Sequence, residues 1–391
     1  MATEFNPQSV DLDTADPRAI VCYLQAGKNE FHGGLGVRVS ALFVIMIVSS
    51  AVTFFPVLAT RSSRFKVPLY VYLFARYFGA GVIVATAFIH LLDPAYSEIG
   101  PNTCVGMTGG WSQYSWPPAI ALTSCVLVFL MDFAAERYVD KKYNSTHVAP
   151  ANEGAAAVRH GSVDAAALKY TTADQRAHSH GHSHQYMHSG EQDGTLPDNI
   201  PEPKALEDGG SGSEHLDIKI KEDFAIETAF RQQIAAFLIL EFGVIFHSAI
   251  IGLTLGTAGS EFATLYPVIV FHQSFEGLGI GARLSAIPFP RRLHWMPWVL
   301  AAGYGLTTPI AIAVGLGLRF TYNSGSFTAN VVSGVLDAVS AGILLYTGLV
   351  ELLARDFLFN PDRTNDDKQL TFMLCSVLLG VGIMALLGKW A

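Results

Sequence analysis

Long apolar stretches recur along most of this chain, and they limit its fold more than any other feature. A helix rises about 1.5 Å per residue, so a stretch of about 20 residues can cross a hydrocarbon core of roughly 30 Å. Only 15% of the 391 residues are charged, whereas a soluble domain carries roughly a quarter. We therefore expect an all-α polytopic membrane protein.

Eight such stretches divide the chain into regions. We expect spans at residues 36–60, 67–92, 116–135, 230–256, 263–284, 295–318, 328–354 and 370–388. Segment 1–35 precedes the first span, residues 36–135 hold helices one to three, and residues 230–391 hold helices four to eight. Residues 136–229 are rich in Gly, Ala, Ser, His and charge, with few large apolar side chains. A segment of that composition cannot bury enough apolar surface to fold alone, so we expect a disordered loop.

Positive charge in the loops predicts the orientation, because cytoplasmic loops are enriched in Lys and Arg. Loops after the first, fifth and seventh spans carry Arg61, Arg64, Lys66, Arg283, Arg291, Arg292, Arg355, Arg363 and Lys368. The short loops on the other side carry only Arg319. Both termini are then outside and the loop 136–229 is cytoplasmic. The chain has no basic tract that would bind a nucleic-acid backbone.

Polar side chains interrupt the fifth span, which reads "FHQSFEG" at its centre. Ionisable groups inside a bilayer are costly, so they point to a function. His272 and Glu276 are four residues apart and share one helix face. The fourth span contains His247 and Ser248, and its direction of crossing brings them to the central part of the bilayer with the other two.

These side chains predict a metal site. Two imidazoles and a carboxylate, with Ser248 and Gln273 as weaker oxygen donors, suit zinc and similar divalent ions. A single intramembrane His is often a hydrogen-bonded packing residue. Three groups at matching depth on two adjacent spans favour the ligand interpretation, with His247, His272 and Glu276 as the ligands.

Four further polar positions leave alternatives open. His90 and Asp93 close the second span, where they could form the site at which metal enters or a polar cap at the membrane interface. Asp337 could line the path or bond a neighbouring helix, and we favour packing. Glu241 is six residues before His247, so we expect it to face elsewhere, toward a structural partner.

The loop 136–229 contains five alternating or nearby histidines, His178, His180, His182, His184 and His188. Neutral imidazoles in a flexible chain can converge loosely on zinc. We expect metal binding there, and leave open whether it regulates the protein.

Two of the four cysteines lie in polar segments on the outer side, where disulfides persist. Cys22 and Cys104 could form one disulfide. Their spacing alone does not prove the pairing, so free thiols remain the alternative.

Three motifs together resemble the ZIP (Zrt/Irt-like) family of divalent-metal transporters, and in particular its fungal plasma-membrane zinc-uptake branch. They read "EFGVIFHSAIIGLTLG", "FHQSFEGLGIG" and "ATAFIHLLDPAY". The resemblance implies a 3+2+3 inverted-repeat bundle with the metal site between helices four and five. It also implies that spans one, four, five and six move against the others. Zinc is then the transported substrate and no cofactor is expected.

The same resemblance suggests partners beyond divalent ions and the lipid bilayer. A homodimer is one, and ubiquitin-dependent turnover machinery at the cytoplasmic loop is another. Family members with a two-metal centre have acidic residues where this chain has Ile251, Gln273 and Thr308. We therefore expect one transported ion in the site.

Other functions remain as alternatives. A broader importer of iron, manganese or cadmium would use the same ligands. An intramembrane zinc hydrolase needs a general base beside an open metal position, and no HExxH motif occurs; we expect no enzyme. A metal-sensing receptor without transport is a further class. Cation-diffusion exporters also have His-rich loops, but they show six spans and paired His/Asp motifs.

Overall fold

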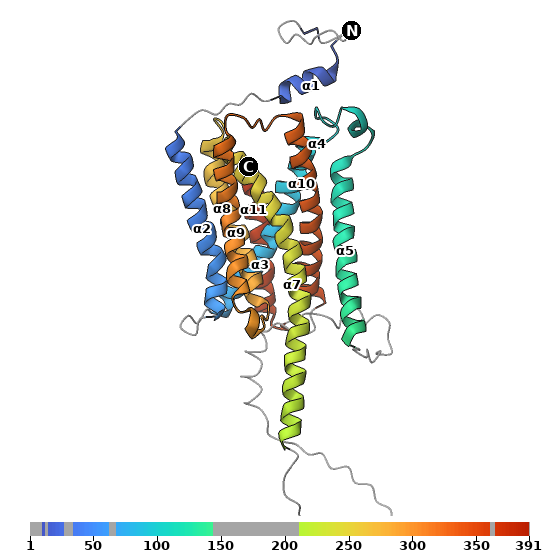
Figure 1. Cartoon of the computed structure of the whole chain (residues 1–391), viewed down its shortest axis with the longest axis vertical. Coiled ribbons are helices and arrows are strands. Elements are labelled where there is room, and N and C mark those ends of the chain that lie inside the picture. Colours follow the sequence, from blue (N-terminus) through green and yellow to red (C-terminus); the bar gives the residue numbers. More distant parts are fainter. Residues whose placement is uncertain are drawn as a thin grey trace, which may run out of the picture.

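The computed structural model describes residues 10–11, 15–26, 34–61, 68–143, 211–359 and 364–390. Within these ranges the regular structure is entirely helical, and the long helices form one bundle (Figure 1). The long helices are α2 (Leu35–Arg61), α3 (Leu69–Ala85), α5 (Trp116–Tyr143), α7 (Ser211–Thr257), α8 (Phe262–Ala286), α9 (Met296–Leu318), α10 (Phe327–Tyr346) and α11 (Asp367–Leu387). The shorter ones are α1 (Pro17–Gln25), η1 (Thr86–Leu92), α4 (Asp93–Ile99), η2 (Gly109–Gln113), η4 (Arg291–Leu293) and η5 (Thr347–Leu358).

Seven of the helices are long and apolar enough to cross a membrane. They cover Leu35–Arg61, Leu69–Ile99, Trp116–Ala135, Gln233–Thr257, Arg291–Leu318, Phe327–Arg355 and Asp367–Leu387. The expectation of an all-α polytopic membrane protein is therefore confirmed. The remaining expected span, 263–284, is the 25-residue helix α8, which carries His272, Gln273 and Glu276 and is less apolar for that reason. At about 1.5 Å per residue it is long enough to cross, and its crossing stays a prediction.

The second span is longer than expected. We predicted an end at residue 92, but helical structure continues through η1 and α4 to Ile99. Pro94 lies in the first turn of α4, directly after the π-helical segment η1. His90 is consequently nine residues, or roughly 13 Å, from the helix end.

Helix also extends into the segment 136–229 from both sides. α5 continues to Tyr143 and α7 begins at Ser211, so the expectation of a wholly irregular segment is wrong at its two ends. Residues 213–229 contain neither Gly nor Pro, and Lys, Glu, Ile and Ala support a helix there. Residues 144–210 lie outside the described ranges, and for them the loop stays a prediction.

The helices pack in two groups. In the first group α7 packs against α9, and α2 packs against α8 and α9. In the second group α3 packs against α11, and α5 packs against α10. The main contacts between the groups are those of α3 with α8 and of α10 with α7. The membership agrees with the sets that the sequence resemblance implies, spans one, four, five and six against the other four.

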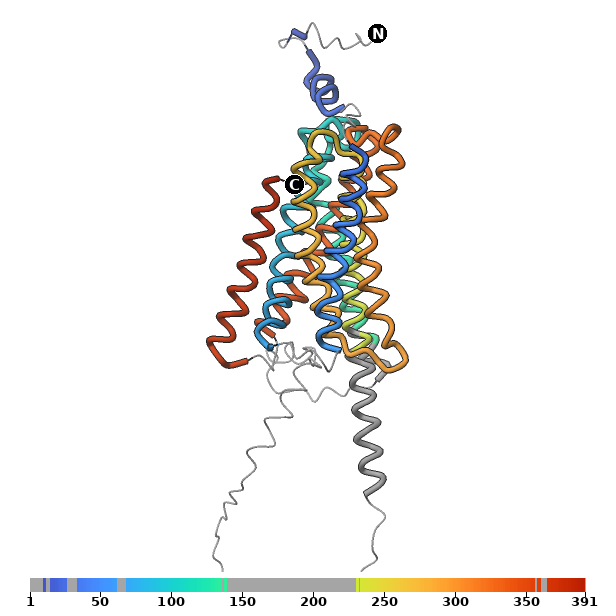
Figure 2. The backbone as a smooth tube through the Cα atoms, turned by 90° about the vertical axis from the view of Figure 1, so that its left-hand side faces the viewer, coloured from blue at the N-terminus to red at the C-terminus, as the bar shows by residue number. Residues whose placement is uncertain are grey.

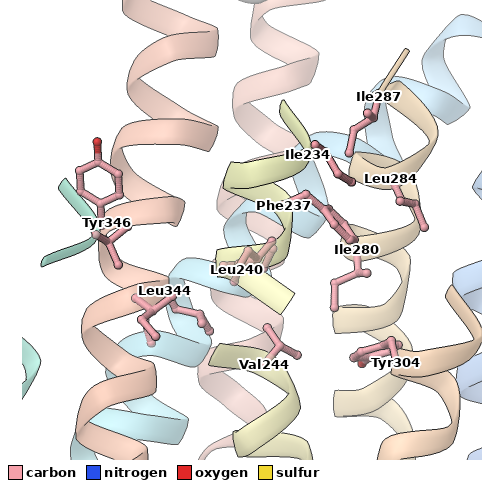
Figure 3. Close-up of a cluster of buried hydrophobic side chains, with 14 of the residues drawn as sticks. Ile234, Phe237, Leu240, Val244, Ile280, Leu284, Ile287, Tyr304, Leu344 and Tyr346 are labelled. Atoms are coloured by element: carbon pink, nitrogen blue, oxygen red, sulfur yellow. The ribbon is translucent and has the colours of Figure 1, made fainter. Parts of the chain in front are cut away.

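The largest apolar core joins α7, α8 and α10 (Figure 3). Phe237, Leu240 and Val244 of α7 lie among Ile280 of α8 and Leu344 of α10, all fully buried. In lipid, helix association depends on close van der Waals packing, because lipid tails are as apolar as the side chains. This core therefore packs α7 closely against α8 and α10 in the conformation described.

The two ends of the bundle differ. α1 and the end of α11 lie at one end (Figures 1 and 2), where a Cys22–Cys104 disulfide joins α1 to the loop after α4. At the opposite end Arg355 contacts Asp132 at 2.9 Å and Glu351 at 2.8 Å. The Arg355–Asp132 pair connects α5 with η5, and the Arg355–Glu351 pair lies within η5.

Candidate metal centre

The helix ends bring His247 and His272 to one depth. α7 and α8 run in opposite directions and are joined by residues 258–261. His247 lies ten residues before the end of α7, and His272 lies ten residues after the start of α8. Each is therefore roughly 15 Å from the helix ends that residues 258–261 connect.

His247, His272 and Glu276 form a buried cluster. Their ligand atoms all lie within 4.8 Å of one another, and within the described residues no other group of three His, Cys, Asp or Glu side chains does so. The three residues are at most 2% exposed. Nε2 of His247 is 3.3 Å from Nε2 of His272, and Nε2 of His272 is 3.8 Å from Oε2 of Glu276.

These distances fit one zinc ion. Two nitrogens bound at about 2.05 Å with a tetrahedral angle lie about 3.3 Å apart, which is the separation of the two Nε2 atoms. The Glu276 oxygen is a few tenths of an ångström farther than a tetrahedral ligand would be, so a small rotamer change brings it to the ion. A dication there would also neutralise the negative charge of the buried Glu276 carboxylate.

Ser248 and Gln273, the expected weaker donors, lie beside the cluster and bond each other. Nε2 of Gln273 donates to Oγ of Ser248 at 3.3 Å, and both side chains are buried. Oε1 of Gln273 is also buried and has no hydrogen-bond partner among the described residues. This unpartnered oxygen is a donor atom that a cation next to His272 could use.

His90 and Asp93 do not form a joint site at the outer rim. His90 is 5% exposed, and its ring centre lies 4.7 Å from that of His272. Its Nε2 is 3.0 Å from the carbonyl oxygen of Met384, whereas Asp93 is exposed. The interfacial cap is thus wrong for His90, because the second span extends past it to Ile99.

Two further residues contact the cluster, and the sequence did not assign them to it. Oδ1 of Asp337 lies 3.9 Å from Nδ1 of His247. The hydroxyl of Tyr304 donates to the Gln273 carbonyl at 2.9 Å and lies 3.4 Å from Oε2 of Glu276. Asp337 is a lone carboxylate in an apolar span, and that feature could have pointed to the site. Tyr304 lies in a span with almost no charge, and no feature of the sequence around it points to the site.

The remaining polar positions lie elsewhere. Glu241 faces α9, where a Cβ added to Gly303 would lie 3.9 Å from its Oε1. Its Oε2 is buried without a hydrogen-bond partner in the described part of the chain. Five loop histidines lie outside the described residues: His178, His180, His182, His184 and His188. Cys22 and Cys104 are bonded, with Cα atoms 4.5 Å apart.

Known proteins with similar sequences are named as zinc transporters. The family model described as ZIP Zinc transporter matches residues 35–388. Zinc-regulated transporter 1 of Saccharomyces cerevisiae is 51% identical over 393 residues, covering 99% of this chain and 97% of the relative. Zinc-regulated transporter 1 of Schizosaccharomyces pombe is 38% identical, covering 98% and 92%. Zinc transporter 9 of Oryza sativa is 32% identical, covering 90% and 89%.

No solved structure matches the chain. The relatives are named as transporters, in agreement with the expectation that the chain is not an enzyme. The family match covers the described helices from the start of α2 to the end of α11. This multi-pass membrane protein belongs to the ZIP zinc transporter family.

Proposed function

We propose that the chain imports Zn²⁺ from outside into the cytoplasm, through the site formed by His247, His272 and Glu276. The observation that carries the proposal is the 3.3 Å separation of two buried Nε2 atoms beside a buried carboxylate. This geometry fits one zinc ion, and the chain belongs to a zinc transporter family. Zinc is the substrate here, not a resident cofactor.

The ligand set suits an ion that must leave again. Two neutral imidazoles and one carboxylate bind zinc without the thiolates that hold structural zinc permanently. Gln273 supplies an oxygen that can replace part of the hydration shell, and Ser248 is its hydrogen-bond partner. Ile251 and Thr308 offer no carboxylate, so we propose one transported ion rather than two.

The transport step is movement of one helix group against the other. His247, His272 and Glu276 belong to α7 and α8 of the first group, whereas His90 and Asp337 belong to the second. A shift between the groups would carry the three ligands away from His90 and Asp337. We infer that His90 is a ligand that passes the ion to His272 from the outer side.

The proposed location is the plasma membrane, with both termini outside. Basic residues in the loops after spans one, five and seven support this orientation. The Cys22–Cys104 disulfide would then lie on the oxidising side. The His-rich loop would be cytoplasmic, where it would bind zinc and recruit ubiquitin-dependent turnover machinery. Homodimer formation is also part of the proposal.

A broader divalent-metal importer is the second candidate, because imidazole and carboxylate ligands also accept iron and manganese. Uptake of radioactive zinc into cells that lack their own importers tests both. We expect zinc to accumulate inside, and excess iron, manganese or cadmium to compete weakly. Equal competition by iron or manganese would favour the broader importer, and no accumulation above empty-vector cells would contradict import.

A further inference from the structure

Asp337 is a buried carboxylate directly behind a ligand of the proposed metal site. Oδ1 of Asp337 lies 3.9 Å from Nδ1 of His247, and the side chains of Asp337 and His247 are 5% and 3% exposed. On the opposite edge of the same ring, Nε2 of His247 faces Nε2 of His272. The imidazole is therefore held between a carboxylate and the metal cluster.

This arrangement selects one tautomer of His247. A neutral imidazole carries its proton on one nitrogen and a lone pair on the other. A carboxylate beside Nδ1 favours the proton there, which leaves the Nε2 lone pair directed at the ion. Metal-binding histidines in proteins commonly donate their second N–H to a carboxylate in this way, and the partner fixes the ring orientation.

Simple interhelical packing explains Asp337 less well. A packing role needs only a hydrogen bond to the neighbouring helix, and any hydrogen-bond donor on α7 would serve. Among the described residues the ion-pair contact of Asp337 is with His247, which is itself one of the three clustered side chains. The carboxylate is thus directed at the site although it contributes no atom to the cluster.

We propose that Asp337 is a positioning residue that sets the tautomer and orientation of His247, and thereby the affinity for the divalent ion. Asp337 lies on α10 and His247 on α7, so the contact joins the two helix groups. It exists while α7 and α10 are packed as described. A shift between the groups breaks this contact. Its loss then lowers the affinity for zinc when the site turns to the other side.

Asp337→Ala and Asp337→Asn test this role, with Thr347→Ala as the matched control. Thr347 is also buried, on η5 directly after α10, and its hydroxyl bonds the carbonyl of Ile343 in its own helix turn. Zinc affinity of the purified proteins is measured by titration calorimetry, and the KM and maximal rate of zinc uptake are measured at matched surface abundance. Nitrogen NMR of labelled histidine reports the tautomer of His247.

We expect Asp337→Ala to weaken zinc binding about 10–100-fold and to raise KM, the range seen when the partner of a metal-bound His is removed. Asp337→Asn should lose less, because it keeps a carbonyl oxygen that can accept a proton from Nδ1–H. Thr347→Ala should bind as the wild type does. Wild-type affinity and an unchanged His247 tautomer in both Asp337 variants would overturn the proposal. If Asp337→Ala does not fold, the Asn variant decides alone, by reduced or unchanged affinity.

The inference rests on the proposed site, and its failure can be told apart from failure of the proposed function. If wild-type protein binds zinc and His247→Ala abolishes binding while neither supports uptake, import is wrong but the role of Asp337 is still measured by affinity. If uptake depends on His247 and the Asp337 variants match the wild type, only the positioning role is wrong.

Discussion

α3 and α8, which belong to different helix groups, approach closely at Gly79 and Gly279. A Cβ added to Gly279 would lie 2.8 Å from Cα of Gly79 and 3.2 Å from its carbonyl carbon and oxygen. These neighbours are backbone atoms, so no side chain can rotate away. Gly279→Ala therefore forces the two helices apart.

The structure sets the size of this effect. Carbon atoms in contact prefer about 3.5–4.0 Å, so the crossing must open by about 1 Å. Overpacking costs about 1–3 kcal/mol, and replacing a helical Gly by Ala returns about 1 kcal/mol. The net loss of folding stability is then about 0–2 kcal/mol, too small to unfold the bundle.

The effect on zinc affinity should be larger than the effect on folding stability. Gly279 is three residues from Glu276, about 4.5 Å along the axis of α8. A movement of about 1 Å exceeds the tolerance of about 0.2 Å in metal–ligand distances. We expect zinc affinity to fall about tenfold or more, measured by calorimetry on purified protein.

Gly382→Ala is the matched control for this substitution. Gly382 lies inside α11, and an added Cβ meets nothing within 4 Å. This variant should bind zinc as the wild type does, with equal or slightly higher thermal stability. Wild-type zinc affinity in Gly279→Ala would refute the close crossing and its link to the site.

Three further predictions concern parts of the chain outside the site. Cys22→Ser opens a disulfide between residues 82 positions apart, and chain entropy limits the loss of folding stability to about 4.5 kcal/mol. We expect this variant to unfold at a lower temperature and to keep its zinc affinity. Reductant should lower the unfolding temperature of the wild type in the same way. Arg355→Ala removes contacts to Asp132 and Glu351 and should lower the folding stability measured by thermal unfolding by about 1–3 kcal/mol. Arg291 is exposed, so Arg291→Ala should not change the folding stability measurably. Deletion of residues 177–188 should preserve the rate of zinc uptake per surface copy and slow zinc-triggered removal from the surface; loss of uptake at normal abundance would make the His-rich loop part of the path.

The sequence predicted the metal cluster because its geometry is mostly local. His272 and Glu276 share a helix face by spacing alone, and a short connection makes α7 and α8 antiparallel neighbours. Those two facts suffice to bring His247 to the same depth.

Contacts between distant helices could not be predicted in the same way. His90 was expected near a helix end because Asp93 and Pro94 looked like a boundary, but helix continues to Ile99 and buries it beside His272. Asp337 meets His247 only because α10 packs on α7. Tyr304 reaches Glu276 from α9, and nothing in its own span marks that contact.

The central claim is that zinc crosses the membrane through His247, His272 and Glu276. Its most direct test is the rate of zinc entry into lipid vesicles that contain purified protein and a trapped zinc-sensitive dye. His247→Ala, His272→Ala and Glu276→Gln are compared with the wild type and with His294→Ala, an exposed histidine outside the cluster. We predict that each of the three cluster variants loses at least about 90% of the rate, as expected when removal of one ligand costs 1.4 kcal/mol or more, and that His294→Ala keeps it. Wild-type rates in all three cluster variants, at equal protein content, would contradict the account.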